Sequence, residues 1–222
     1  MERPWLKSYE DGVPHSINYP DVSLSSILSG IADEFPDKTA IIFYGKKISY
    51  RELNSEVNRL ANALIALGVE KGDRVGLMLP NLPQAIMGYY GILKAGAIVV
   101  EISPLYVERE LKHLIVDSGA QVIIALDIFY PRIEAVINGV HLKAIILTGV
   151  RDYLPPILKL LYPIKAKREG QWIKIKKTRP VYDLKDLIRR SRDDDPCIDV
   201  SADETALLQY TGGTTGIPKG VV

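Results

Sequence analysis

Cysteine and histidine are scarce in this sequence, which has one cysteine, Cys197, and three histidines in 222 residues. A single cysteine excludes a disulfide bond within the chain, and so few thiols and imidazoles lead us to expect no metal site. The lack of disulfides is typical of a reducing, cytoplasmic compartment. Net charge is also missing, because 28 Lys and Arg residues balance 27 Asp and Glu residues. We therefore expect no nucleic-acid partner.

Long hydrophobic runs are absent as well. The most apolar stretch, residues 85–100, contains Lys94 and three glycines, so it is too short and too interrupted to cross a bilayer. Residues 1–7 lack the apolar centre of a secretory signal peptide. What remains is a globular composition, with 47% hydrophobic and 25% charged residues, which excludes disorder. The sequence predicts a cytoplasmic protein that touches membranes, if at all, only at their surface.

Strand and helix patterns alternate through the middle of the chain. Unbroken apolar runs such as residues 122–126 are typical of strands that are covered on both faces. Such runs predict strands at 74–79, 97–102, 121–126 and 143–147, with helices at 81–95, 108–118, 131–137 and 184–190. In this scheme Asn81 caps the first of these helices and Gly119 ends the second. The alternation predicts an α/β fold with a doubly wound, mainly parallel sheet flanked by helices.

The N-terminal part is expected to be an extended arm, residues 1–20, followed by an α/β subdomain over residues 21–192. A helix is predicted at 23–35, and a hairpin of strands 40–44 and 48–50 around a turn at 45–47. Ser49 and Glu52 have the spacing of a capping box at the start of the next helix, which Gly68 ends.

Residues 151–179 interrupt the alternation. They carry nine basic residues against two acidic ones, interleaved with apolar side chains. The favoured interpretation is an insertion that packs its apolar side on the domain and exposes its charges to water. The alternative is a peripheral membrane contact, through attraction to anionic lipid and insertion of apolar side chains.

Residues 193–222 are expected to form a linker, a strand and a phosphate-binding loop. The acidic linker 193–196 is predicted to be a solvated turn, because its spacing is not that of a calcium loop. A strand is predicted at 205–210. It leads into residues 211–220, where four glycines, three threonines and one lysine occur together.

This glycine-rich segment suits a polyphosphate. Glycines let the backbone amides approach an anion, threonine hydroxyls add donors, and a lysine adds a mobile charge. The order of residues matches neither the P-loop motif nor the dinucleotide-binding fingerprint. A flexible surface loop is the alternative interpretation. The predicted ligands of the phosphates are Thr211, Gly212, Gly213, Thr214, Thr215, Gly216 and Lys219.

The segment resembles the phosphate-binding signature of the adenylate-forming (AMP-binding) enzymes. Ser49–Leu53 and Leu93–Ala97 resemble two further motifs of these enzymes, in the same order along the chain. Pro80–Gln84, Ser103–Tyr106, Asp117–Ala120 and Gly213 are similar to the long- and medium-chain fatty acyl-CoA synthetase branch. One departure is Val107, which stands where a capping threonine is common and should weaken that helix start by about 1 kcal/mol.

The resemblance implies a two-step ligase reaction. A fatty acid carboxylate attacks the α-phosphate of ATP with Mg²⁺ to form an acyl-adenylate, and the thiol of CoA then displaces AMP. Residues 211–216 would hold the β- and γ-phosphates, and Lys219 would either pair with phosphate or hold the loop in place through an acidic neighbour. The catalytic glutamate and lysine of the family lie beyond residue 222, so no catalytic residue is assigned here.

The resemblance further implies that the sequence is the N-terminal part of a longer ligase and is inactive alone. Residues 193–222 would then open a second subdomain that is missing from the sequence. In that case the chain would need a C-terminal partner chain or form a homo-oligomer. The alternative is a module that binds ATP or pyrophosphate, or a partner, without turnover.

Overall fold

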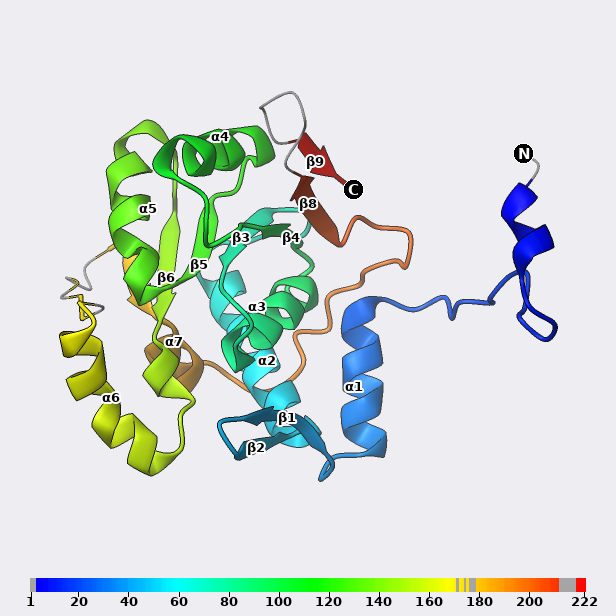
Figure 1. Ribbon diagram of the computed structural model, residues 1–222, viewed down its shortest axis with the longest axis horizontal. Coiled ribbons are helices and arrows are strands. Elements are labelled where there is room, and N and C mark those ends of the chain that lie inside the picture. Colours follow the sequence, from blue (N-terminus) through cyan, green and yellow to red (C-terminus); the bar gives the residue numbers. More distant parts are fainter. Residues whose placement is uncertain (1–2, 171, 174, 176–178, 212–218) are drawn as a thin grey trace.

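The computed structural model describes residues 3–170, 172–173, 175, 179–211 and 219–222. Its centre is a seven-stranded sheet in the order β7-β6-β5-β3-β4-β8-β9 (Figure 1). The strands from β7 to β8 are parallel, and β9 runs antiparallel to β8. The strands are β3 (Arg74–Met78), β4 (Ile98–Glu101), β5 (Val122–Leu126), β6 (Ala144–Thr148), β7 (Val181–Asp183), β8 (Leu207–Thr211) and β9 (Lys219–Val221).

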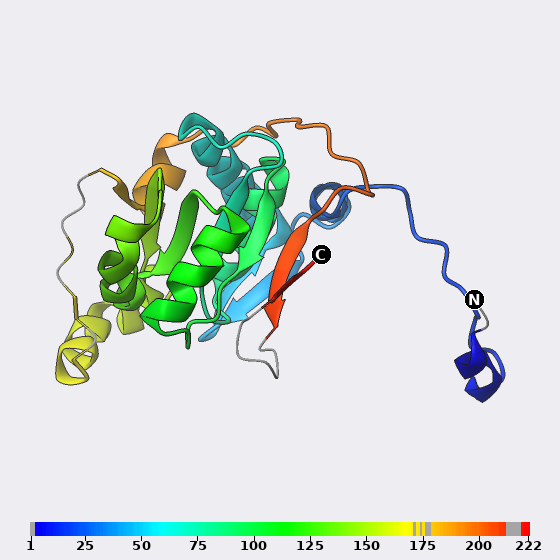
Figure 2. The same cartoon turned by 90° about the horizontal axis from the view of Figure 1, so that it is seen from above.

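Helices cover both faces of this sheet, as the unbroken apolar strands predict. One face carries α2 (Tyr50–Ala66), α3 (Pro83–Lys94) and α7 (Leu184–Arg190). The other carries α4 (Glu108–Ser118) and α5 (Tyr130–Val136), and the two layers are seen in Figure 2. The predicted α/β fold with a doubly wound, mainly parallel sheet is confirmed.

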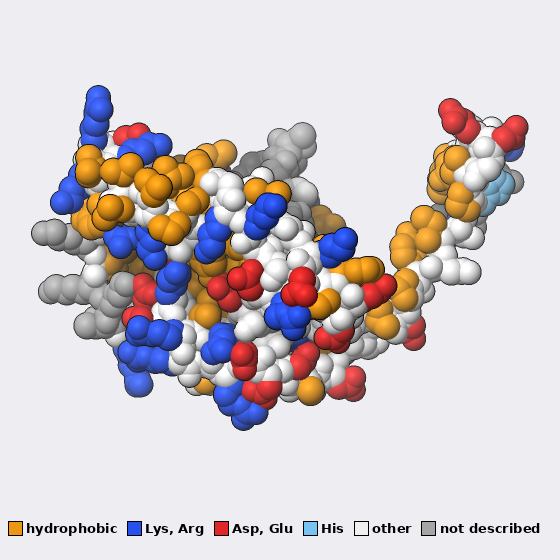
Figure 3. Space-filling view, turned by 90° about the horizontal axis from the view of Figure 1, so that it is seen from below, with side chains coloured by type: hydrophobic (Ala, Val, Ile, Leu, Met, Phe, Trp, Pro, Cys, Tyr) orange, Lys and Arg blue, Asp and Glu red, His pale blue; other side chains and the backbone are white. Residues whose placement is uncertain are grey.

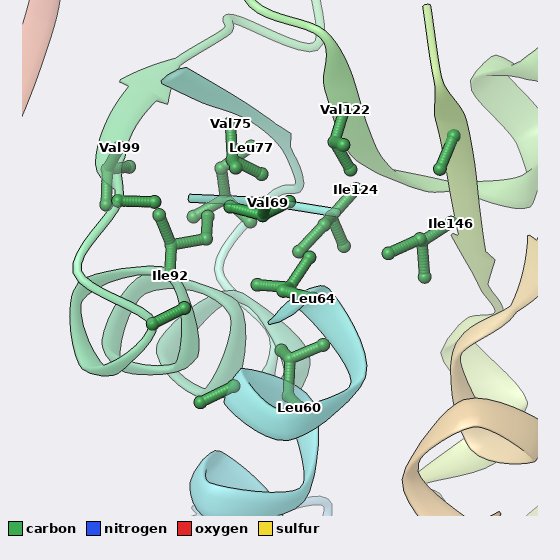
Figure 4. Close-up of a cluster of buried hydrophobic side chains, with 14 of the residues drawn as sticks. Leu60, Leu64, Val69, Val75, Leu77, Ile92, Val99, Val122, Ile124 and Ile146 are labelled. Atoms are coloured by element: carbon green, nitrogen blue, oxygen red, sulfur yellow. The ribbon is translucent and has the colours of Figure 1, made fainter. Parts of the chain in front are cut away.

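The core between α2, α3 and the sheet is closely packed (Figure 4). Leu60 and Leu64 of α2 meet Ile92 of α3 and the strand side chains Val75 and Ile124, and all five are fully buried. Every residue of β5 and β6 is buried. Burial of this extent stabilises the fold by roughly 25 cal/mol for each Å² of apolar surface removed from water.

A smaller layer is formed by α1 (Leu24–Glu34) and the hairpin β1 (Thr39–Phe43) and β2 (Lys46–Ser49). The hairpin turns at Tyr44 and Gly45, both with positive φ, and not at the predicted residues 45–47. Two residues with positive φ match the twist of a tight hairpin. The predicted capping box is confirmed, since Ser49 and Glu52 exchange both hydrogen bonds at the start of α2.

Two other helix starts differ from simple capping. Asn81 does not cap α3, because the cap position is Leu82 and Pro83 begins the helix. Pro83 suits this position because the first helical N–H has no partner within the helix. The Val107 side chain has no oxygen and cannot cap α4. Instead, the Glu110 carboxylate accepts a hydrogen bond from the Val107 N–H at 3.0 Å.

The remaining elements are short or lie at the periphery. The chain before α1 extends away from the body and includes one turn of 3-10 helix, η1 (Pro4–Ser8) (Figure 1). Helix α6 (Pro156–Arg168) lies within the interrupting segment 151–179. Three further 3-10 turns are η2 (Asp127–Phe129), η3 (Ile137–Gly139) and η4 (Val150–Asp152).

A connecting segment, residues 191–206, leads from α7 to β8 across α2 and α3. Arg59 on α2 forms an ion pair of 2.8 Å with Asp193. Lys94 on α3 forms one of 2.9 Å with Asp195. The acidic linker is exposed to solvent, as predicted, and these ion pairs also bind it to the helical layer. The sequence did not predict these ion pairs, because the partners lie about 100 residues or more away along the chain.

Candidate phosphate-binding site

The candidate site begins where β8 ends. β8 pairs in parallel with β4, so Thr211 lies at the carboxyl edge of the sheet, the edge at which open α/β sheets bind ligands. The chain returns as β9, and Thr211 is directly opposite Lys219 in the antiparallel register. Both residues are exposed to solvent. The structure thus brings together the two ends of the predicted phosphate segment.

The other predicted ligands lie outside the described residues. They are Gly212, Gly213, Thr214, Thr215 and Gly216, within the seven-residue segment that joins β8 to β9. Their assignment to the phosphates stays a prediction. The antiparallel pairing on either side fixes only where this segment starts and where it ends.

Tyr210 anchors the base of the segment. Its ring is buried, and its hydroxyl donates a hydrogen bond of 2.6 Å to the Asp117 carboxylate of α4. Burial and the nearby carboxylate raise the pKa of Tyr210, so the phenol stays protonated and keeps donating. On β9, a Cβ added to Gly220 would lie 3.2 Å from the Tyr210 ring, so glycine allows a close approach. One tyrosine therefore holds both strands in place.

Sequence reasoning treated residues 205–210 as an ordinary core strand and missed this anchor. The Asp117 carboxylate lies 93 residues away in sequence, so no local pattern could reveal it. The available signal was a tyrosine at the end of an apolar strand, since a buried phenol usually finds a hydrogen-bond partner.

The loop between β4 and α4 follows the strand next to β8 at this edge. Arg132 of α5 donates to the carbonyl oxygens of Pro104, at 2.5 Å, and of Tyr106, at 3.3 Å. These bonds hold the loop against the sheet, while the Leu105 side chain remains exposed. An apolar side chain is therefore presented at the carboxyl edge beside β8, in the segment 103–106 that the sequence singled out.

A hollow of about 420 Å³ lies at the opposite, amino edge, between α1 and the connecting segment. Its lining is mostly apolar or small, and its carboxylate, Glu204, forms an ion pair of 2.8 Å with Lys71. Among the described residues that line this hollow, the ion pair therefore leaves no unpaired charged side chain. Thr211 and Lys219 do not line it.

No group of three or more His, Cys, Asp or Glu side chains is placed to hold a metal ion in the part of the chain that the structure describes. Within the same residues, no helix combines the length and the hydrophobicity needed to cross a bilayer.

These features define a class of protein. The sheet is doubly wound, and a strand followed by a glycine- and threonine-rich segment ends at its carboxyl edge. The model of the AMP-binding enzyme family matches residues 29–222, and the chain belongs to this family.

Close relatives within the family are long-chain-fatty-acid–CoA ligases. A long-chain-fatty-acid–CoA ligase of Bacillus subtilis is 42% identical over 224 residues, which take in all of this chain and 40% of the relative. The enzyme of the same name from Yersinia pestis is 38% identical, with the same coverage. A solved long-chain-fatty-acid–CoA ligase from Archaeoglobus fulgidus matches 96% of this chain and 38% of its own, with a TM-score of 0.75 and 26% identity. The chain therefore corresponds to the N-terminal part of these ligases and spans about 40% of the length of the curated relatives.

Proposed function

We propose that this chain provides the N-terminal α/β part and the phosphate-binding loop of an ATP-dependent fatty acid–CoA ligase. One observation carries the proposal: in a member of the AMP-binding family, exposed Thr211 and Lys219 face each other across β8 and β9 at the carboxyl edge. The segment between them consists of three glycines, two threonines, an isoleucine and a proline. Backbone amides and hydroxyls so concentrated suit an anion with several oxygens.

In this proposal the chain's residues bind and orient the nucleotide. The amides of the glycines and the hydroxyls of Thr211, Thr214 and Thr215 donate to the β- and γ-phosphates. Lys219 adds a positive charge that offsets the charge developing on pyrophosphate as it leaves. When bound, ATP with Mg²⁺ supplies the phosphorus that a fatty acid carboxylate attacks, and CoA supplies the thiol that forms the thioester.

The 222 residues by themselves are proposed to bind nucleotide without turnover. The chain matches about 40% of its relatives, and catalysis requires groups that position the acid and the thiol as well as the phosphates. Those groups would come from a C-terminal partner chain, from a second copy, or from further residues of a longer chain. The alternative function, a module that binds ATP or pyrophosphate without turnover, makes the same prediction for the chain alone.

A chimera separates the two. This chain replaces the corresponding N-terminal part of the Bacillus subtilis relative, and fatty acid-dependent exchange between ATP and pyrophosphate is measured. The ligase proposal predicts exchange in the chimera and none in the chain alone. It also predicts that Lys219→Met lowers the exchange rate at least tenfold, about 1.4 kcal/mol, while the exposed control Lys47→Met does not. Nucleotide binding by the chain with no exchange in the chimera would favour the module. No nucleotide binding at all would refute both.

A further inference from the structure

Helix α6 is an unusual surface element. It follows β6 through Gly149 and the turn η4, and Ala166 is the helix residue that is buried. Lys159, Tyr162, Pro163 and Ala166 lie on one side and are the less exposed positions. The opposite side faces water.

Four large apolar side chains form a stripe on that outer side. Their exposed fractions are 74% for Ile157, 79% for Leu160, 50% for Leu161 and 69% for Ile164. The spacing i, i+3, i+4, i+7 places them on one face of the helix. Figure 3 shows hydrophobic side chains gathered on this region of the surface, with Lys and Arg at its margin. The favoured sequence interpretation, in which the apolar side packs on the domain, is wrong for this stripe.

The charges on the helix are basic: Lys165, Lys167 and Arg168 are exposed, while Lys159 lies on the inner side. Helix α6 contains Lys159, Lys165, Lys167 and Arg168 and no acidic residue. Glu169, just past the helix end, lies 3.9 Å from Lys165. Beyond the helix, Trp172 is partly exposed, and the Lys167 ammonium lies 5.5 Å from the centre of its ring. Tryptophan beside lysine is typical of the boundary between lipid and water.

From this arrangement we infer that α6 docks on the surface of an anionic phospholipid membrane, lying in its plane with the stripe inserted among the acyl chains. Thirteen residues of helix span about 20 Å, enough to lie on a bilayer and too short to cross one. The lysines beside the stripe would pair with the lipid phosphates.

The basic side chains of α6 argue against a second copy, or another protein surface, as the partner of the stripe. A second copy docked stripe to stripe would bring two basic margins together, which like-charge repulsion opposes. Protein interfaces are depleted in lysine, and three of the four basic residues of α6 are lysines. An anionic bilayer needs no matching shape and tolerates long, flexible basic side chains.

The position of α6 relative to β8 determines where a bound bilayer would lie. Strands β6 and β8 are parallel, so the chain leaves β6 toward α6 at the same carboxyl edge at which β8 ends with Thr211. Figure 2 shows α6 and the end of β8 at this edge of the sheet. Figure 1 places α6 and β8 toward opposite ends of the molecule, and the stripe is on the face seen in Figure 3, so a bilayer bound to α6 would lie away from Thr211. The docking itself does not depend on the proposed ligase function, because it needs neither nucleotide nor fatty acid.

Vesicle flotation tests the inference directly. The 222-residue chain is mixed with phosphatidylcholine vesicles with or without about 30 mol% phosphatidylglycerol, in about 0.1 M and about 0.5 M NaCl. We expect binding to the anionic vesicles, at least tenfold weaker binding to pure phosphatidylcholine, and release at high salt. Absence of binding to anionic vesicles at low salt would overturn the proposal.

Matched variants locate the contact. Ile157→Gln/Leu160→Gln should weaken binding at least tenfold, whereas Ile65→Gln/Val116→Gln, two exposed apolar positions on α2 and α4, should not. Lys165→Gln/Arg168→Gln should weaken it about fivefold for each charge, in anionic vesicles only, with the exposed pair Lys38→Gln/Lys47→Gln as the control. Circular dichroism checks that each variant is folded.

Two results would refute the membrane surface. Equal losses in the stripe and control variants would mean that α6 is not the contact. Conversion of an oligomer to a monomer by the stripe variant, with unchanged lipid binding, would show that a second copy covers the stripe.

Discussion

Replacing Lys94 by methionine removes an ammonium group that joins four parts of the fold. The Lys94 side chain is 3% exposed, and its Nζ lies 2.9 Å from the Asp195 carboxylate. The same Nζ donates to Ser29 Oγ at 2.7 Å, to Asn54 Oδ1 at 3.1 Å and to Asn58 Oδ1 at 2.7 Å. The ammonium therefore links α1, α2, α3 and the connecting segment.

The loss of stability depends on whether each partner of the Lys94 ammonium can bind water once the ammonium is gone. Methionine fills the volume of the lysine stem, so the cavity term is small. The buried amide oxygen of Asn58 loses its donor, which costs about 1–3 kcal/mol. Removing one member of a fully buried ion pair costs about 3–5 kcal/mol, but Asp195 is 42% exposed and regains water. We expect Lys94→Met to lower the free energy of unfolding by about 2–3 kcal/mol, the sum of the amide loss and a reduced ion-pair loss.

Urea unfolding followed by circular dichroism measures this change. A slope of about 2–3 kcal/mol per molar urea converts it to a midpoint shift of about 1 M. Asp195→Asn leaves the 3%-exposed Lys94 ammonium without its counter-ion and should cost about 3 kcal/mol, because this buried charge cannot regain water. The control is Lys38→Met, an exposed lysine, which should stay within about 0.5 kcal/mol of wild type. A Lys94→Met midpoint equal to that of the control would refute the reasoning.

Three further changes test other contacts. Tyr210→Phe removes the hydrogen bond to Asp117 and should lower the free energy of unfolding by about 1–2 kcal/mol; an unchanged thermal midpoint would contradict the anchor. Glu56→Gln keeps an acceptor for the Tyr153 hydroxyl but removes a carboxyl whose pKa is raised by burial. A raised pKa means that the folded wild-type protein binds a proton at Glu56 more readily than the unfolded chain does. The free energy of unfolding of the wild type should therefore fall relative to that of the variant as the pH rises from about 4 through the raised pKa. The opposite trend in urea unfolding would disprove this expectation. Ser49→Ala removes the cap of α2 and should cost about 1 kcal/mol by thermal unfolding, and no loss would count against the capping box.

Acid pH should weaken the same ion pair that Lys94→Met removes, this time by protonating Asp195. Burial alone would raise the pKa of Asp195, but the Cys197 N–H and the Lys94 ammonium outweigh it and hold that pKa below its ordinary value. A lowered pKa stabilises the fold above the unfolded-state pKa near 3.8, and this stabilisation is lost as the pH falls through the lower folded value. The connecting segment is therefore secured at neutral pH.

Periodicity and turn chemistry were enough to predict most of the elements. Apolar runs located β3 to β6 because strands covered on both faces must be apolar throughout. The Ser49 capping box and Gly119, which has a φ of +66°, marked helix ends through local backbone chemistry. The hairpin turn was misplaced because Tyr44, a residue that rarely adopts positive φ, occupies such a conformation.

The rest depended on contacts between distant residues. β7 and β9 have three residues each, too few for a periodic signal, and their strand character comes from pairing with β6 and β8. The glycine-rich composition located the candidate site, but nothing in that segment indicated the Tyr210–Asp117 anchor beneath it. The outward face of α6 also escaped prediction, because local sequence does not tell which side of an amphipathic helix meets the domain.

The connecting segment explains how side chains remote from any phosphate position the candidate site. β7 and β8 lie toward opposite ends of the sheet, so the chain must cross the helical layer between them. Gly96 permits the crossing, because its φ is +74° and a Cβ there would lie 2.7 Å from the Ile198 side chain. Lys71 then holds the segment through the Asp199 carbonyl oxygen, at 2.6 Å. The segment held in this way leads into β8, whose pairing with β4 sets the position of Thr211 at the carboxyl edge.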